Sequence, residues 1–224
     1  MKSEISKKRT LWFTIVNIFL VITTIIVTYI TIAFCTVDGQ VDTNVEYGWF
    51  YIATFTVQSN ILLGIIALFG TVFGIRSLKK TKPLPRKFLV LYLMAASAAM
   101  LTSLTVIFFL APIRAISGKN YFDMFLGPMF FFHFFNPFLS AAAFIYLTPA
   151  IRFAKDDGYM ALLPPALYAV PYILNVIILH TWYDFYNFTF GGKNWAVVFV
   201  FIVISSVTFS VARLLVYLHN HRKI

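Results

Sequence analysis

Residues 11–34 read LWFTIVNIFLVITTIIVTYITIAF, a run that contains no charged side chain. A helix needs about 20 predominantly apolar residues to cross the ~30 Å hydrocarbon layer of a bilayer. Strands of a membrane barrel would be about half as long and would alternate in polarity. Further apolar stretches of comparable length follow, at 49–75, 88–111, 125–150, 160–180 and 195–218. The sequence therefore predicts an all-α polytopic membrane protein, a six-transmembrane-helix bundle that forms a single domain over residues 1–224.

Composition and charge agree with that prediction. Of the 224 residues, 60% are apolar and 12% are charged, which is unlike an ordinary soluble domain. With a cytoplasmic N-terminus, 15 of the 18 Lys and Arg residues fall on inner segments, and Arg114, Lys119 and Lys193 fall on outer ones. The positive-inside rule then predicts that both termini are cytoplasmic. We interpret the net charge of +10 as a topology signal, with basic residues in short loops that face lipid headgroups. The expected partners are therefore membrane lipids and not nucleic acid.

His133 is the titratable side chain that lies deepest in an apolar stretch, within the sequence FFFHFFNP of residues 130–137. An imidazole at membrane depth is costly and usually points into a bundle or cavity, which makes His133 a functional-site candidate. At ~1.5 Å per residue, Thr56 reaches the same layer, on the order of 10 Å below the outer boundary. We expect a pocket there that opens outward, although polar side chains at this depth also serve as hydrogen bonds between packed helices. The supporting polar layer would comprise Ser59, Asn60, Asn136 and Asn175.

The residue types at this depth restrict the chemistry. A zinc or iron site requires three or four His, Cys or carboxylate ligands, and the sequence places no second ligand near His133, so we expect no metal and no cofactor. All eight acidic residues lie outside the apolar stretches or at their ends, which disfavours a carboxylate-driven pump. A neighbouring imidazole activates a hydroxyl for acyl transfer. Thr56 and His133 meet the depth requirement for such a pair, and Asn60 or Asn136 could orient the imidazole or donate to an oxyanion.

Two segments carry a resemblance to known membrane proteins. The sequences FTVQSNIL at residues 55–62 and HFFNP at residues 133–137 look like those of bacterial six-span membrane proteins of unknown function, and are more distantly similar to the androgen-induced-gene family. Members of that family are six-span hydrolases of fatty acid esters of hydroxy fatty acids that use an intramembrane Thr and His. The resemblance implies a protein of the bacterial cell membrane that hydrolyses a hydrophobic acyl-ester substrate, with Thr56 as nucleophile and His133 as base.

Alternatives stay open for both the nucleophile and the function. Thr54 also adjoins Phe55 and could replace Thr56, but the two positions are rotated by ~200° about the helix, so only one of them can face His133. The polar layer could instead belong to a non-catalytic membrane protein that binds lipid or transports a small solute. The oligomeric state is left open. Cys35 is the single cysteine, which excludes a disulfide within the chain.

Overall fold

The computed structural model describes residues 2–34, 36–37, 40–41, 45–80, 82–182 and 184–222. The described residues are largely helical, with one antiparallel pair of two-residue strands, β1 (Thr36–Val37) and β2 (Gln40–Val41). Within these ranges, five helices are long and apolar enough to cross a membrane. The prediction of an all-α chain with membrane-type helices is therefore confirmed. Cys35 lies outside the described residues.

The five long helices correspond to five of the six apolar stretches. They are α1 (Lys2–Phe34), α2 (Phe55–Lys80), the run of α3 (Arg86–Thr105), η2 (Val106–Leu110) and α4 (Ala111–Ile116), the run of η6 (Lys155–Leu162), α6 (Leu163–Tyr172) and η7 (Ile173–Ile178), and α7 (Asn194–His221). The second stretch begins differently from the prediction, because η1 (Val45–Ala53) is a 3-10 helix and α2 starts only after Thr54.

The fourth stretch is shorter than its sequence suggests. The hydropathy pattern predicts a span over 125–150, whereas the apolar helix covers Phe131–Leu147. Gly127, with a left-handed φ of 56°, precedes Pro128, so the chain cannot continue a helix there. The helix comprises η4 (Phe131–Phe135), α5 (Asn136–Ala142) and η5 (Ala143–Leu147), and a short 3-10 helix, η3 (Tyr121–Phe125), comes before it.

Prolines account for two wide turns inside these helices. Both η2 and η4 are π-helical turns, and each ends two residues before a proline, Pro112 and Pro137 respectively. Proline lacks the N–H that would bond back along the helix, and its ring clashes with a preceding carbonyl, so a wider turn relieves both problems. Such π turns are frequent at functional sites, and η4 contains His133.

α1 and α2 pack closely along a row of small residues. Gly64 and Gly70 of α2 face Thr24 and Asn17 of α1, and a Cβ atom added at Gly64 would lie only 2.7 Å from Thr24 Cγ2. Small residues let the backbones of two helices approach, and van der Waals packing is the main source of helix association in a membrane. This pair therefore forms a tight unit that fixes where α2 begins.

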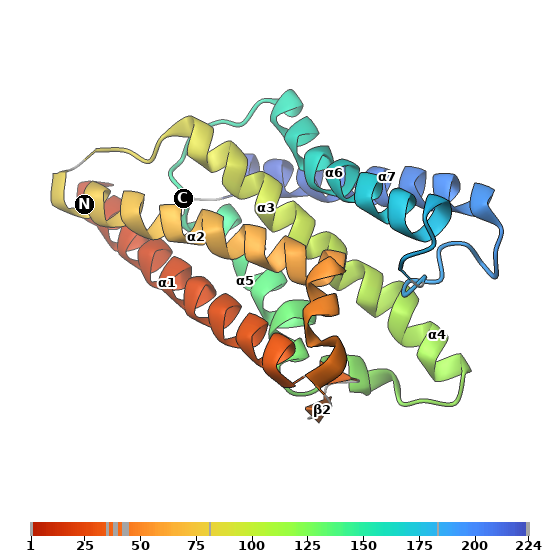
Figure 1. Ribbon diagram of the computed structural model, residues 1–224. Coiled ribbons are helices and arrows are strands. Elements are labelled where there is room, and N and C mark those ends of the chain that lie inside the picture. Colours follow the sequence, from red (N-terminus) through yellow and green to blue (C-terminus); the bar gives the residue numbers. More distant parts are fainter. Residues whose placement is uncertain are drawn as a thin grey trace.

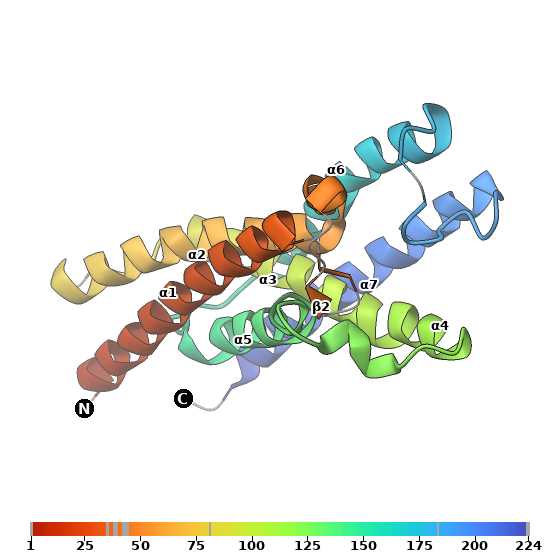
Figure 2. The ribbon, with the colours of Figure 1, turned by 60° about the horizontal axis from the view of Figure 1, so that its bottom comes forward.

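α3 lies in the middle of the bundle. It contacts α2 on one side, α6 and α7 on the other, and α5 as well, so the α1–α2 pair and the α6–α7 pair flank it (Figures 1 and 2). The first turns of α1 and the last turns of α7 lie at the same end of the molecule (Figure 1). Toward the other end, the start of α2 meets the second half of α3, where Ser59 and Thr102 are hydrogen-bonded.

Candidate functional site

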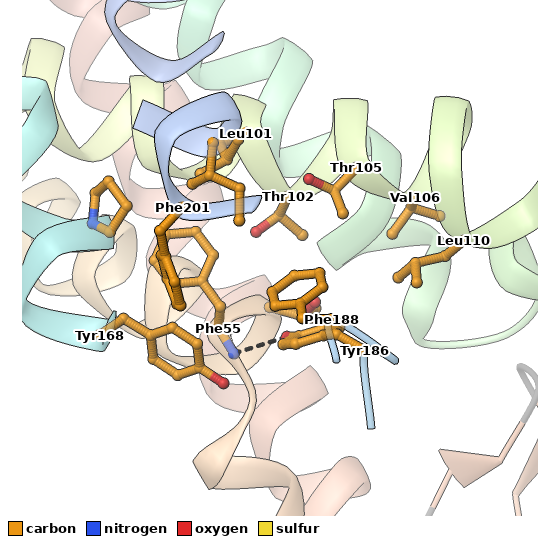
Figure 3. Close-up of a pocket in the computed structure, with 13 residues that line it drawn as sticks. Phe55, Leu101, Thr102, Thr105, Val106, Leu110, Tyr168, Tyr186, Phe188 and Phe201 are labelled. Carbon is orange, nitrogen blue, oxygen red and sulfur yellow. Dashed lines mark hydrogen bonds between the residues drawn. The ribbon is translucent and has the colours of Figure 1, made fainter. Parts of the chain in front are cut away.

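Thr56, in the first turn of α2, lines a narrow pocket. The pocket lies between α2, α3, α6, α7 and the segment that precedes α7 (Figure 3). The pocket has a volume of about 30 Å³, which is room for about two water molecules. Most of its wall is aliphatic or aromatic. The lining residues that carry a hydroxyl group are Thr56, Thr102, Thr105, Tyr168 and Tyr186. An apolar wall with a few convergent hydroxyls suits the polar end of an otherwise apolar molecule.

Tyr186 connects the start of α2 to the segment before α7. Its hydroxyl oxygen accepts a hydrogen bond from the amide of Phe55, at 2.9 Å (Figure 3). Burial raises the pKa of this phenol, and hydrogen bonds with Thr56 and Phe55 oppose the rise. Tyr186 is therefore a neutral phenol at physiological pH, so it can donate a hydrogen bond beside Thr56 but is not a base.

Asp184 holds the segment that carries Tyr186. Its carboxylate accepts a hydrogen bond from the Tyr172 hydroxyl and from the amides of Phe188 and Thr189, the last two at 2.9 and 2.7 Å. Burial raises the pKa of Asp184, but these hydrogen bonds outweigh burial, so the pKa lies below its ordinary value. The ionised carboxylate thus fixes the turn that brings Tyr186 and Phe188 to the pocket.

A larger apolar groove lies beside the pocket, between the α3–η2 run and α7. Its volume of about 380 Å³ is within the usual range for small-molecule sites. Leu101, Thr105, Phe188 and Ile204 line both the groove and the Thr56 pocket, so the two spaces adjoin. Phe108, on the rim of the groove, is 74% exposed. In a bilayer this opening would face lipid, and an apolar chain could approach the hydroxyl groups from the side.

His133 lies in η4 and is only 6% exposed. Its Nδ1 atom is 2.5 Å from the carbonyl oxygen of Met124, so Nδ1 carries a proton, and in the neutral imidazole Nε2 is then an acceptor. The ring packs edge-on against Phe125. Among the described residues, no hydrogen bond joins His133 to Thr56 or Thr54, and His133 does not line the Thr56 pocket. The catalytic pair Thr56–His133 therefore stays a prediction.

Asn60 joins the start of α2 to η4. Its Nδ2 atom donates to the carbonyl oxygen of Thr56 at 2.9 Å and to that of Phe132 at 3.2 Å. In a π turn the N–H of residue 137 would bond to the carbonyl of residue 132, but Pro137 has no N–H. Asn60 gives that carbonyl a donor instead. The start of α2 and η4 are thus neighbours, although Thr56 and His133 share no hydrogen bond.

Ser59 and Asn136 extend this polar region to α3 and α1. Ser59 Oγ lies 2.8 Å from Thr102 Oγ1, and Asn136 Oδ1 accepts a hydrogen bond from Thr23 Oγ1 at 3.0 Å. The Nδ2 atom of Asn136 is buried and has no hydrogen-bond partner among the described residues. A buried donor without a partner costs about 1–3 kcal/mol.

Thr54 and Asn175 bond only within their own segments in the described part of the chain. Thr54 Oγ1 accepts the Val57 amide at 3.4 Å, which makes Thr54 a cap for the start of α2. The side-chain amide of Asn175 donates to the Pro171 carbonyl and accepts from the Thr181 hydroxyl. Ser59, Asn60 and Asn136 therefore bond between segments of the bundle, whereas the side chains of Thr54 and Asn175 do not.

Sequence reasoning missed Tyr186, Asp184 and Phe188, because they lie in a connection between two apolar stretches. The available signal was composition, since residues 182–190 read WYDFYNFTF. Large aromatic side chains are seldom left in water in such number, so a connection of this composition is expected to pack back into the bundle.

Comparison of the chain with protein-family models, with curated proteins and with solved structures finds no match in any of the three. Within the described ranges, no group of three or more His, Cys, Asp or Glu side chains is placed to hold a metal ion. The interpretation of the site therefore depends on its geometry and its hydrogen bonds.

Proposed function

We propose that the chain is an integral membrane protein of six spans that binds a lipid-like molecule with its acyl chain in the groove between the α3–η2 run and α7. The polar end of that molecule would occupy the Thr56 pocket, where Thr102 and Tyr186 also offer hydroxyl groups. One observation carries this proposal. The apolar groove and the hydroxyl-lined pocket adjoin, because four residues line both.

The two parts of the site would contribute differently to binding. An acyl chain that enters the groove from a bilayer leaves one apolar environment for another, so its transfer supplies little free energy. The polar end of the molecule gains more, because hydrogen bonds between groups in a membrane contribute roughly 0.6–2 kcal/mol each. We therefore expect the hydroxyl groups of Thr56 and Tyr186 to determine which lipid is held, and the groove to determine chain length and access.

The six-span topology includes the short helix Phe131–Leu147 as the fourth span. Its 17 residues reach ~25 Å, at the lower limit for crossing the hydrocarbon layer. An even number of crossings is consistent with α1 starting and α7 ending at the same end of the bundle (Figure 1). The positive-inside rule favours a cytoplasmic location for that end.

Ester hydrolysis is a second candidate function, and one observation favours it. Thr56 lies at the inner end of the route that an acyl chain would take, where the ester group of a bound lipid would lie. In this reaction Thr56 Oγ1 would attack the ester carbonyl while His133 Nε2 accepts its proton, and the C–O bond to the alcohol would break as the alcohol takes that proton and leaves. Water, deprotonated by His133, would then hydrolyse the acyl ester on Thr56 and release the fatty acid. With Nδ1 bonded to Met124, a neutral His133 would offer Nε2 as the base, and η4 would have to bring it to Thr56.

A photoreactive fatty-acyl probe tests lipid binding in native membranes. Val203 lines the groove and is 43% exposed, whereas the neighbouring Ile202 is 59% exposed and lies outside the groove. We expect Val203→Trp to block the groove and reduce crosslinking severalfold, and Ile202→Trp to leave it at the wild-type level. Equal crosslinking of the two variants would remove the groove from the proposal.

A lipid-like fluorophosphonate probe separates binding from hydrolysis. Labelling that is lost in Thr56→Ala and His133→Ala but kept in Thr54→Ala would support hydrolysis. Acyl-probe capture in the groove without any fluorophosphonate labelling would support binding alone.

A further inference from the structure

Besides the Thr56 pocket and the groove, a basic cavity lies at the C-terminal end of α7. Its volume is about 390 Å³, and its charged and polar lining residues are Arg152, His219, Asn220, His221 and Arg222. The groove ends at Val207 on the same helix. From position 207 to position 219 an α-helix rises ~18 Å, so this cavity is separate from the Thr56 pocket.

Hydrogen bonds hold the wall of this cavity in place. The side-chain amide of Asn220 bonds both the amide and the carbonyl of Phe153, at 3.1 and 3.0 Å. Arg222 donates to the carbonyl oxygen of Thr148 at 2.7 Å. His219 is 2% exposed and is bonded to the same segment. The end of α7 is therefore fixed against residues 148–153, and Arg222 does not depend on a ligand for its position.

The arginines of the cavity form no ion pair with any described carboxylate. In the part of the chain that the structure describes, the ion pair is Arg86–Asp157, and no carboxylate pairs with Arg152 or Arg222. Burial, and secondarily the charge of Arg9 on α1, lower the pKa of Arg222 to about 10. Arg222 is still charged at neutral pH. Like charges gathered in one concave site create a potential that attracts anions.

Donor groups remain available in this cavity. Arg222 uses two N–H groups for backbone carbonyls, which leaves others on the same guanidinium. Arg152 is exposed and forms no side-chain hydrogen bond within the described residues. His221 Nδ1 bonds to the Tyr217 carbonyl at 2.9 Å, so its Nε2 atom is left for a ligand. Arginine presents its N–H groups in a planar fork that matches the oxygen atoms of a phosphate group.

We propose that this cavity is a binding site for a phosphate-bearing anion, held by Arg152, His221 and Arg222. The same chemistry would recognise the headgroup of an anionic phospholipid at the membrane surface or a soluble phosphate. The site goes beyond the proposed acyl-chain binding and does not depend on it, because the two cavities share no residue.

The experiment titrates two probes against the purified full-length protein in phosphatidylcholine nanodiscs. One arm adds phosphatidylglycerol to the nanodiscs, with bound lipid counted by native mass spectrometry. The other adds inorganic phosphate, with binding measured from the shift in melting temperature. The variant is Arg152→Gln, because Arg152 is exposed and its loss leaves the hydrogen bonds of the wall intact. The control is Arg76→Gln, an exposed arginine of α2 outside the cavity.

We expect Arg152→Gln to weaken binding of one probe about fivefold and Arg76→Gln to leave it unchanged. A loss confined to phosphatidylglycerol would identify a lipid headgroup as the ligand, and a loss confined to inorganic phosphate would identify a soluble one. Equal affinity of the wild type and both variants for both probes, or an equal loss in the two variants, would overturn the proposal.

Discussion

At the scale of single residues, the pocket depends on a carboxylate that lies outside every apolar stretch. Asp184 accepts three hydrogen bonds, and two of them come from the backbone of the turn that carries Phe188. These bonds hold the turn from which the Tyr186 hydroxyl reaches the Phe55 amide at the start of α2. Asp184 thus positions the site without lining it.

Asp184→Asn should lower the stability of the protein by roughly 1–2 kcal/mol, because a neutral amide accepts fewer and weaker hydrogen bonds than a carboxylate. The folded pKa of Asp184 lies below the ordinary value of 3.8, so the contribution is present above that pH and is lost as the pH falls through the folded pKa. Melting in detergent from pH 7 to pH 3 should show a difference between wild type and variant that narrows at acid pH. Asp156→Asn, on an exposed carboxylate, should show no such pattern, and a constant difference for Asp184→Asn would contradict this role.

The sequence predicts the depth of a residue in the bundle, but it does not predict the direction in which the side chain points. Depth follows from the rise of a helix, and near Thr56 the side chains of Ser59 and Asn60 do bond across to α3 and η4. Direction requires an unbroken helical period. His133 lies inside the π turn of η4, where the α-helical period is broken. The sequence could therefore place His133 in the layer, but it could not predict that the ring would face Met124.

At the scale of elements, the length of the apolar stretches predicted where the helices lie. Capping residues, glycine and proline determine where those helices begin. The residues before Thr54 are apolar, yet they form a 3-10 helix, and Thr54 caps a separate α-helix. Gly127 and Pro128 shorten the fourth stretch in the same way. Hydropathy averages over a window, so it does not register a single cap or a left-handed glycine.

The contact between α1 and α2 leaves no room for a methyl group at Gly64. Gly64→Ala would place a methyl group 2.7 Å from Thr24 Cγ2 and 2.9 Å from Thr24 Cβ. Because Cβ is attached to the backbone, the two helices themselves must separate, at a cost of about 1–3 kcal/mol. Gly64→Ala should therefore melt at a lower temperature than the wild type.

A double-mutant cycle tests the stated cause. Thr24→Ala removes Cγ2, so the double variant Gly64→Ala/Thr24→Ala should recover part of the loss caused by Gly64→Ala. Strict additivity of the two substitutions would show that the helices do not meet at this pair.

At the scale of the whole molecule, the distribution of basic residues and the course of the helices make the same prediction. α1 begins where α7 ends (Figure 1), and Arg9 of α1 is close enough to Arg222 to lower its pKa. α2 ends and α3 begins toward that end as well (Figure 1). If this end is cytoplasmic, the charge distribution follows the positive-inside rule, and the connections after α4 and before α7 face outward.

Single cysteines in a Cys35→Ser background test this orientation without changing any of the 18 basic residues. Ser117→Cys and Asn194→Cys place an exposed thiol at the proposed outer end, and Pro83→Cys and Ala154→Cys place one at the inner end. In intact cells a membrane-impermeant maleimide should label the first two, and the second two should react only after the cells are opened. The short helix Phe131–Leu147 makes the test demanding, because it lies between Ser117 and Ala154. If it does not cross, these two positions will react alike, and the six-span topology will be wrong even though every other helix is long enough.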